Sequence, residues 1–384
     1  MTLQSSGPIS ASDIINEFGA TRDNSSNPDR TRIGDYRKVS SSPTSGNPSF
    51  SNYPHDLGEL SFSSLDGGNN IPTSGTIRFS DFRGTKLQQV VNFYSSGAGG
   101  NRLNAYERYD DNGEAGSGEA VVCVGNHKTR PQNSSNTRVH IHVNKSIGST
   151  TSGSDPVKRC ALRTGSGWES GTELRVDVGG EGRIQGAGGK GGNGSSGSGK
   201  GGNAEDGTSG LGIQYGTAAN ETVVSIASGG IIRCGYGGGG GGGGGHDHDH
   251  KSEKTASGAG GGGGAGIPAG AHGENGTGGG GGGTPNGPDG EEGSLNAGGS
   301  GGAESATGEA EAKGGQGGGG ADQENFNAED GEEGEGGEGS GGGGGTGGGN
   351  GAAIRKTNSN ILFEFEAGTS IPSSSGVTNA TGVL

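Results

Sequence analysis

The chain has 384 residues, of which 97 are glycine and only 24% are hydrophobic, so a single large hydrophobic core is excluded. Twelve prolines without a Gly-X-Y period exclude collagen. A formal net charge of −15 argues against a nucleic-acid partner.

Residues 1–95 contain a duplicated signature, Ser-Gly-x-Ile-x-x-Ser-Asp followed by an apolar residue, which begins at Ser6 and again at Ser74. Each copy predicts a brief extended segment and then a short helix, which Ser12 or Ser80 caps. Both copies are too poor in apolar residues to fold alone, so we predict that they dock onto another protein. The predicted docking residues are Ile9, Ser12, Asp13, Ile14, Ile77, Phe79, Ser80, Asp81 and Phe82.

Residues 96–160 predict a small β domain. The segments 120–124 and 137–143 are its clearest strands, and turns rich in Gly, Asn and Ser surround both. Alternation in the second segment places Val139, Ile141 and Val143 on one face. His140 and His142 form a His-x-His pair on one strand face, which is either a metal site or two surface histidines.

Residues 161–238 contain a second internal repeat. Glu173–Val178 leads into a Gly turn, a short strand at 182–184 and a glycine stretch, and Glu221–Ile226 begins the same order 221 − 173 = 48 residues later. The repeat predicts a β platform from which the glycine runs extend. In the predicted C-terminal region, 353–384, the alternating segment 360–366 predicts a strand that returns to this platform.

Residues 239–352 are predicted to form a glycine domain with five loops. Six glycine runs lie within 237–245, 258–266, 276–283, 298–302, 314–320 and 339–351. They fit either a flexible linker or an ordered bundle of polyglycine II helices, which have three residues per turn and pack closely because glycine has no Cβ. An isolated run would not offset its ordering entropy, so order requires several runs of similar length that enclose one another. Repeated runs with distinct interruptions favour the bundle.

The five polar segments between the runs are 246–257, 267–275, 284–297, 303–313 and 321–338. If they cluster at one end, they form a binding surface on a rigid scaffold; the alternative is a set of solvated turns. The candidate binding residues are His246, Asp247, His248, Asp249, His250, His272, Glu274, Asn286, Asp289, Glu309, Phe326 and Asn327.

Two concentrations of polar residues stand out in this domain. His246–His250 alternates His with Asp, so two or three imidazoles could converge on zinc or nickel; the alternative is a hydrated loop. Between Asp289 and Glu338 there are 14 acidic residues and one lysine, a balance of −13. We interpret this stretch as a solvated surface, with a bridging cation or a basic partner as the alternative.

The remaining motifs give no support for catalysis, and we predict that the chain is not an enzyme. No Gly-x-Ser-x-Gly motif lies between a strand and a helix, and the paired carboxylates lack an apolar pocket. We therefore predict no cofactor, apart from a metal ion at a His-x-His site. Cys123, Cys160 and Cys234 have no scaffold spacing and predict buried, reduced thiols. Met1–Ser6 does not resemble a signal peptide, and no apolar run is long enough to span a membrane.

The order of these segments resembles that of a known family. Glycine runs alternating with short variable segments are similar to the tip adhesins of T-even-like phage long tail fibres. In that family the runs pack as polyglycine II helices, and the loops recognise outer-membrane proteins or sugars. The stretch from Thr164 to Gly189 is similar to segments before glycine-rich regions in other phage tail proteins. The duplicated signature resembles N-terminal segments of structural proteins from tailed phages, notably marine and cyanobacterial ones.

The resemblance implies a mostly β and irregular fold with short docking helices at the N-terminus, a small β region and a polyglycine II bundle. It implies a virion tail protein, made in the host cytoplasm, that contacts other tail proteins through residues 1–95 and a host receptor through its loops. Phage fibres sometimes bind metal through His-x-His pairs around a threefold axis, which would apply to His140 and His142 in a homotrimer. The alternative function is purely architectural, as in a baseplate, neck or connector protein.

Overall fold

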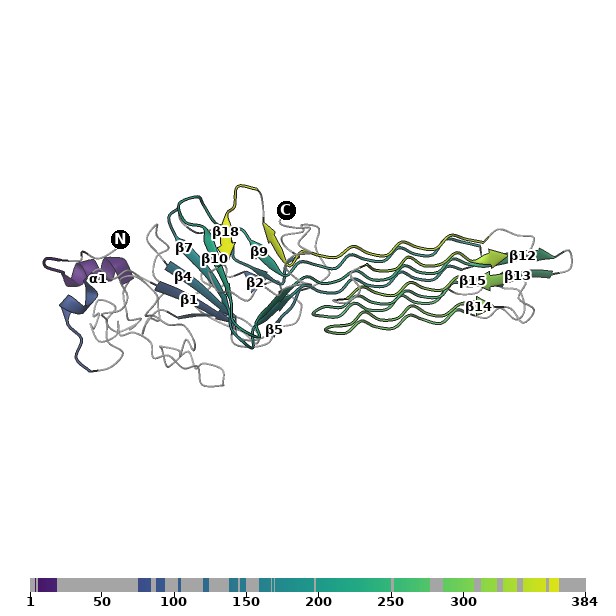
Figure 1. The fold of residues 1–384 in the computed structure, drawn as a ribbon, viewed down its shortest axis with the longest axis horizontal. Coiled ribbons are helices and arrows are strands. Elements are labelled where there is room, and N and C mark those ends of the chain that lie inside the picture. The colour runs from purple at the N-terminus through teal and green to yellow at the C-terminus, as the bar shows by residue number, and fades with distance from the viewer. Residues whose placement is uncertain are drawn as a thin grey trace, which may run out of the picture.

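In the computed structural model the chain is mostly strand and irregular structure, with very few helices. The structure describes residues 4, 6–18, 75–83, 88–93, 103–104, 120–123, 138–143, 146–149, 159–166, 168, 170–196, 198–249, 252–276, 286–306, 312–322, 327–336, 341–356 and 359–365. The molecule is elongated (Figure 1): α1 lies at one end, a group of β-sheets follows, and long parallel chain segments extend to the other end. Among the described residues, no helix has the length and apolarity needed to cross a membrane.

The two copies of the N-terminal signature have the same local structure. α1 (Ala11–Phe18) follows the first Ile, and a 3-10 helix, η3 (Phe79–Phe82), follows the second. In the first copy, the Asp13 carboxylate accepts hydrogen bonds from the Ser10 N–H, at 2.8 Å, and the Ser10 hydroxyl, at 2.7 Å. In the second copy, the Arg78 N–H donates to Asp81 at 2.7 Å. Ser10 and Arg78 therefore occupy the capping positions, and the prediction that Ser12 and Ser80 cap these helices is wrong.

The signature also sets which of its residues are buried. Ile14 and Phe82, the apolar residues that end the two copies, are both buried, and Ile9 and Ile77 are partly buried. Ser12 and Ser80 are exposed, and so is Phe79, of which 44% is accessible to solvent. The sequence also predicts that these helices end at Gly19 and Gly84, and both glycines lie outside the described residues.

Three sheets of mostly parallel strands form a stacked unit, here called the solenoid base. The first sheet has the order β18-β10-β7-β4-β1-β3, the second β11-β8-β5 and the third β17-β9-β6-β2. Pairing between neighbours is parallel except between β1 and β3. The strands are β1 (Gln88–Phe93), β2 (Leu103–Asn104), β3 (Ala120–Cys123), β4 (Arg138–Val143), β5 (Ser146–Ile147), β6 (Leu162–Arg163), β7 (Glu173–Val178), β8 (Arg183–Gln185), β9 (Leu211–Ile213), β10 (Thr222–Ile226), β11 (Ile231–Arg233), β17 (Ile354–Lys356) and β18 (Phe363–Phe365).

From β4 onward, the strands of the base visit the three sheets in turn along the chain, so this part of the chain coils as a solenoid. The core lies between the sheets as ladders of buried apolar side chains in register. Ile141, Val176 and Val224 align on the first sheet. Ile147, Ile184 and Ile232 align on the second, and Leu162, Leu211 and Ile354 on the third. Such stacking buries a continuous core that one coil alone could not form.

The internal repeat of the sequence corresponds to two adjacent coils. Val223 pairs with Arg175 and Ile231 with Arg183, so the offset in register is 223 − 175 = 48 residues, the same as the repeat. The prediction that the 360–366 segment returns to this platform is confirmed, because β18 pairs with β10. The predicted small β domain contributes β4 and β5 to the same sheets, so it is continuous with the platform.

The glycine-rich segments form an array that emerges from the base between the second and third sheets (Figure 1). Among the described residues, two runs connect β8 to β9 and eight connect β11 to β17, while most of the predicted glycine run 276–283 lies outside them. In the part of the chain that the structure describes, the hydrogen-bonded runs are 186–195, 199–210, 235–244, 257–267, 270–276, 287–294, 297–302, 314–321, 328–334 and 341–352. The array therefore begins well before residue 239, where the sequence analysis placed its boundary.

Each run makes its backbone hydrogen bonds with a period of three residues. Every third residue of the 235–244 run bonds to the same two neighbouring runs. The N–H groups of Gly235, Gly238, Gly241 and Gly244 donate to the backbone carbonyls of residues 208, 205, 202 and 199, in that order. Their carbonyls accept from the backbone N–H groups of residues 351, 348, 345 and 342. The residues in between bond in the same way to the 186–195, 257–267, 314–321 and 328–334 runs. The 235–244 run therefore has six neighbours, and all of its residues are buried. The 257–267 run is likewise hydrogen-bonded to six others.

The number of neighbours accounts for the number of glycines. The 235–244 run, which has six neighbours, contains nine glycines in ten residues, and the 257–267 run, which also has six, contains only glycine and alanine from 258 to 266. The 186–195 run has four neighbours, and glycine occupies about two of its positions in three. The 270–276 and 287–294 runs have three neighbours, and their glycines recur only at every third residue. At each of these recurring positions, a Cβ atom would lie closer than 3.0 Å to a neighbouring backbone. Glycine is therefore required only where a backbone faces a backbone.

Polar side chains on the outer runs complete the hydrogen bonding of the array. Backbone N–H groups that face no carbonyl donate instead to side-chain oxygens, at 2.7 to 3.2 Å. The acceptors are Asn193, Asn203, Asp206, Asp289, Asp322, Glu329, Asp330 and Asn350. Part of the acidic stretch therefore has a structural role within the array, which neither the solvated surface nor the bridging cation or basic partner expected from the sequence includes.

Candidate interaction surface at the tip of the glycine array

The runs alternate in direction, so the segments between them lie alternately at the two ends of the array. The turns at 267–269 and 294–297 lie beside the solenoid base, because their neighbours are residues 183–188 of β8 and the run after it. The strands β12 (Gly245–Asp249), β13 (Ser252–Ala256), β14 (Ser305–Ala306), β15 (Ala312–Gly314) and β16 (Glu335–Gly336) lie at the far end, here called the tip (Figure 1).

This alternation separates the predicted binding residues. His246 to Asp249 are at the tip on β12, but His272 and Glu274 lie along the 270–276 run, and Asp289 lies along the 287–294 run. Asn286 directly precedes that run, and Asn327 lies near the base. His250, Glu309 and Phe326 lie outside the described residues. The five segments therefore do not gather at one end, because three of them, 267–275, 284–297 and 321–338, contain runs with glycine at every third position.

Two small sheets pack together at the tip. β12 and β13 form an antiparallel hairpin, and β14, β15 and β16 form a three-stranded sheet with antiparallel pairing. The Gly245 backbone lies directly against the carbonyl groups of Lys313 and Glu335, which leaves no room for a side chain. The Ser305 hydroxyl donates to the Ser257 carbonyl at 2.6 Å, and the Ser257 hydroxyl accepts from the Gly287 N–H at 2.9 Å. The base of the hairpin is thereby fixed to the end of the array.

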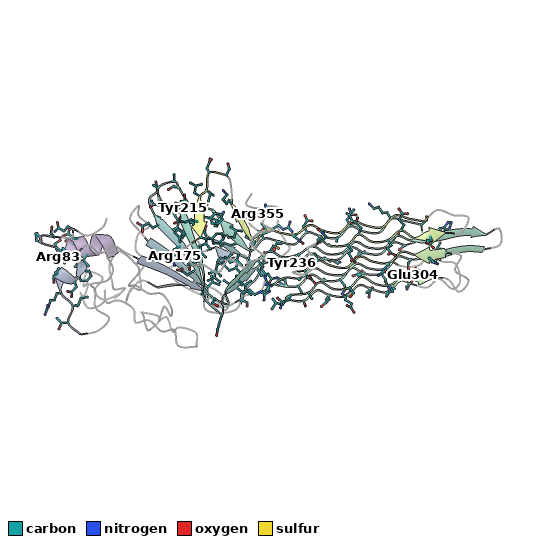
Figure 2. The ribbon with its side chains drawn as sticks, viewed as in Figure 1. Arg83, Arg175, Tyr215, Tyr236, Glu304 and Arg355 are labelled. Atoms are coloured by element: carbon teal, nitrogen blue, oxygen red, sulfur yellow. The ribbon has the colours of Figure 1, made fainter. Side chains whose placement is uncertain are left out.

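The described tip residues are polar and of mixed charge. Lys313 Nζ lies 3.2 Å from Glu335 Oε2, and 34% and 72% of their side chains are exposed. The hydrogen bond and negative charge of Glu335, with a further contribution from Glu304, raise the pKa of Lys313. Figure 2 shows Glu304 near this end of the molecule. Hydrogen bonding and charge pairing are therefore the interactions that the described part of this surface offers to a partner.

The opposite end of the array is joined to the base by a buried polar cluster. Arg183 donates to Gln185 Oε1 and Asn296 Oδ1, each at 2.7 Å, and Gln185 donates to the Leu295 carbonyl at 3.2 Å. Burial, and next the charge of Arg233, lowers the pKa of Arg183 to about 10. Tyr236, labelled at this junction in Figure 2, is buried, and burial raises its pKa. These contacts fix the array, and hence the tip, to the solenoid.

The histidine pair predicted as a metal site lies on the solenoid. His140 and His142 are on β4, where they pair with Arg175 and Asp177 of β7 and with Val90 and Asn92 of β1. Their side chains lie outside the described residues. The side chains of residues 247–249 and 252–254, on the hairpin, also lie outside the described part. Among the side chains that the structure describes, no three from His, Cys, Asp or Glu form a group that could hold a metal ion.

Two features of this architecture were missed in the sequence. Five runs were interpreted as platform or loop, and the usable signal was glycine at every third position; they are 186–195, 199–210, 270–276, 287–294 and 328–334. The side-chain acceptors were also missed, although Asn and Asp recur three residues apart in 203–206. Compared with known proteins, the chain matches no protein-family model, no curated protein and no solved structure.

Proposed function

We propose that the glycine array is a bundle of polyglycine II helices that acts as a rigid arm. The three-residue period of the hydrogen bonds supports this assignment, since that helix has three residues per turn and no internal hydrogen bonds. Six neighbours around the 235–244 run supply what its backbone needs, because each residue both donates and accepts. Each hydrogen bond contributes a net stabilisation of about 1 kcal/mol, and together with close packing these bonds offset the entropy lost when the backbone becomes ordered.

We propose further that the protein is a structural component of a phage tail that binds the host surface. In this proposal residues 1–95 dock to other tail proteins, and the tip meets a receptor, either an outer-membrane protein or a glycan. The main support for this proposal is the position of the β12–β13 hairpin. It directly follows the enclosed 235–244 run and lies at the end of the molecule opposite α1. A rigid arm that separates a polar tip from a docking segment suits an adhesin, and the resemblance to tail-fibre adhesins favours it.

A purely architectural role in the virion is the second candidate. The distribution of the polar segments favours it, because only some of them lie at the tip and others form runs or turns at the base. The described tip residues also include no aromatic side chain of the kind that stacks on sugars. In this case the array is a spacer, and the tip contacts a neighbouring virion protein.

Binding of the full chain to washed cells of the bacterium that the phage infects separates these candidates. Saturable binding that blocks phage adsorption is the expected result for an adhesin. A hairpin variant, Asp247→Asn with Lys254→Gln, should weaken binding, whereas Glu292→Gln on the side of the array should not. Equal unfolding temperatures show that all proteins are folded. Absence of binding by folded wild-type protein would contradict adhesion and favour the architectural role.

A further inference from the structure

The hairpin at the tip brings a carboxylate into register with the alternating histidines. In the pairing of β12 with β13, His246 is opposite Thr255, and His248 is opposite Glu253. Directly opposite residues of an antiparallel pair share one face of the sheet, and so do residues two apart on one strand. Positions 246, 248, 253 and 255 therefore belong to one face, and positions 247, 249, 252 and 254 to the other. The sequence shows the alternation of His and Asp, but only the register pairs Glu253 with His248.

We propose that the hairpin face carrying His246, His248 and Glu253 is a zinc site. Two imidazoles and one carboxylate are a donor set that zinc accepts in a tetrahedral site with one open position. Residues two apart on a strand are separated by roughly 7 Å, and opposite Cβ atoms by about 5 Å. Backbone positions at these spacings suit a single zinc ion, whose bonds to imidazole and carboxylate are about 2.0–2.2 Å long.

The position of the hairpin gives such an ion a structural purpose. A two-stranded hairpin is only marginally stable alone, and this one is held mainly at its base, where Gly245 meets the β15 and β16 backbones. An ion that joins β12 to β13 beyond that point would tie the two strands together. The fourth position would remain open to water or to a donor atom from a partner.

The opposite face of the same hairpin supplies a matched control. There Asp247 is opposite Lys254, and Asp249 is opposite Ser252. This face has carboxylates but no histidine. Asp249→Asn therefore removes a carboxylate only one residue pair farther along the hairpin than Glu253, and on the opposite face.

The test is a calorimetric titration of the full chain with Zn²⁺ after treatment with a chelator. The wild-type protein should bind one tight equivalent at the hairpin. His248→Ala and Glu253→Gln should each weaken that site at least ten-fold, because even outer-shell partners of metal ligands are worth about 10–100-fold in affinity. Asp249→Asn should bind as the wild type does. Visible absorption of the Co²⁺-substituted protein gives a second measurement, since tetrahedral and octahedral Co²⁺ differ in spectrum.

The second His-x-His pair requires its own variant. A protein with both His140→Ala and His142→Ala should still bind one equivalent of Zn²⁺ tightly. Loss of zinc binding in that variant alone, or equal affinities in the wild-type, His248→Ala and Glu253→Gln proteins, would overturn the proposal, as would a wild-type protein that binds no zinc. Thermal unfolding of each variant verifies that it is folded. The titration involves no host cell, so its outcome is independent of the adhesive function.

Discussion

The backbone of Gly241 faces the carbonyl group of Asn193 so closely that a Cβ atom on Gly241 would lie well under 3.0 Å from that oxygen. The two residues belong to neighbouring runs, 235–244 and 186–195, and Gly241 is also hydrogen-bonded to Gly202 at 2.9 Å and to Gly345 at 2.7 Å. The three atoms nearest to such a Cβ all belong to the backbone of Gly192 and Asn193, so no flexible side chain could move aside to make room.

Gly241→Ala is accordingly expected to destabilise the protein strongly. Overpacking a close-packed interior typically costs about 1–3 kcal/mol, and a rigid backbone lattice places this site at the upper end or beyond. Gly343→Ala is the control, because a Cβ atom there would meet nothing within 4 Å. Thermal unfolding should show a large loss for the first variant and little change for the second. Equal unfolding temperatures would mean that the runs do not enclose one another.

The glycines that recur at every third residue should be as sensitive as those in pure glycine runs. A Cβ atom on Gly290 would collide with the backbone of Gly261, whereas Glu292, two residues later, is exposed. Gly290→Ala should therefore lower stability by about 1–3 kcal/mol, and Glu292→Ala should change it by less than about 0.5 kcal/mol. Denaturant unfolding measures both. A tolerant Gly290 would show that 287–294 is a solvated loop.

Side-chain acceptors on the outer runs should protect particular amides from hydrogen exchange. Asp206 accepts a hydrogen bond from the Gly349 N–H at 2.7 Å. Asp206→Ala should speed exchange at Gly349 about five-fold, which corresponds to the roughly 1 kcal/mol of a net hydrogen bond. Asp206→Asn keeps a side-chain oxygen and should retain most of the protection. Unchanged exchange in the alanine variant would remove the role assigned to this carboxylate.

The stability of the first turn of α1 should depend on pH, because the ionised carboxylate of Asp13 holds it. Hydrogen bonds from the side chain and then the backbone of Ser10 lower the pKa of Asp13 from its ordinary 3.8. A lowered folded-state pKa means that the stabilisation is complete above the unfolded-state value and is lost as the pH falls through the folded-state value. NMR titration should therefore give a pKa below 3.8 for Asp13. Ser10→Ala should raise it, and Ser12→Ala should not; the reverse would restore Ser12 as the cap.

Two cysteines should be unreactive in the folded protein. Cys160 and Cys234 are free thiols and are buried, and burial raises the pKa of the Cys234 thiol to about 11. At pH 8 only about one Cys234 thiol in a thousand is then ionised, and the thiolate is the reactive form. In a Cys123→Ser background, iodoacetamide should modify neither residue until denaturant is added. Rapid labelling of Cys234 in native protein would show that the junction between base and array opens.

The sequence predicted the solenoid better than the array. The 48-residue repeat and the alternation in 137–143 both reflect side chains, so they identified β4, β7, β8, β10 and β11 near their observed positions. The prediction that Cys160 and Cys234 are buried thiols is confirmed. It too depends on a property of the side chain, because a free cysteine behaves as a small apolar residue and is usually buried.

The array was harder to predict because its contacts are between backbones. A search for stretches made almost only of glycine and alanine finds the two runs with six neighbours. An outer run such as 270–276 needs glycine on one face only, so its sequence resembles that of a polar loop. The same ambiguity placed His272 and Asp289 among the loop residues. The register that joins His248 to Glu253 could not be predicted either, because it depends on a turn whose length the sequence does not define.

The three-residue period also limits how a molecule of this kind can diverge. A single inserted residue within 235–244 would shift every later hydrogen bond to the wrong neighbour, and even a full triplet fits only if the adjoining runs grow in step. Insertions beyond Asp249 meet no such restriction, because the hairpin projects past the lattice. Related sequences should therefore keep a common arm length and differ in length at its outer end.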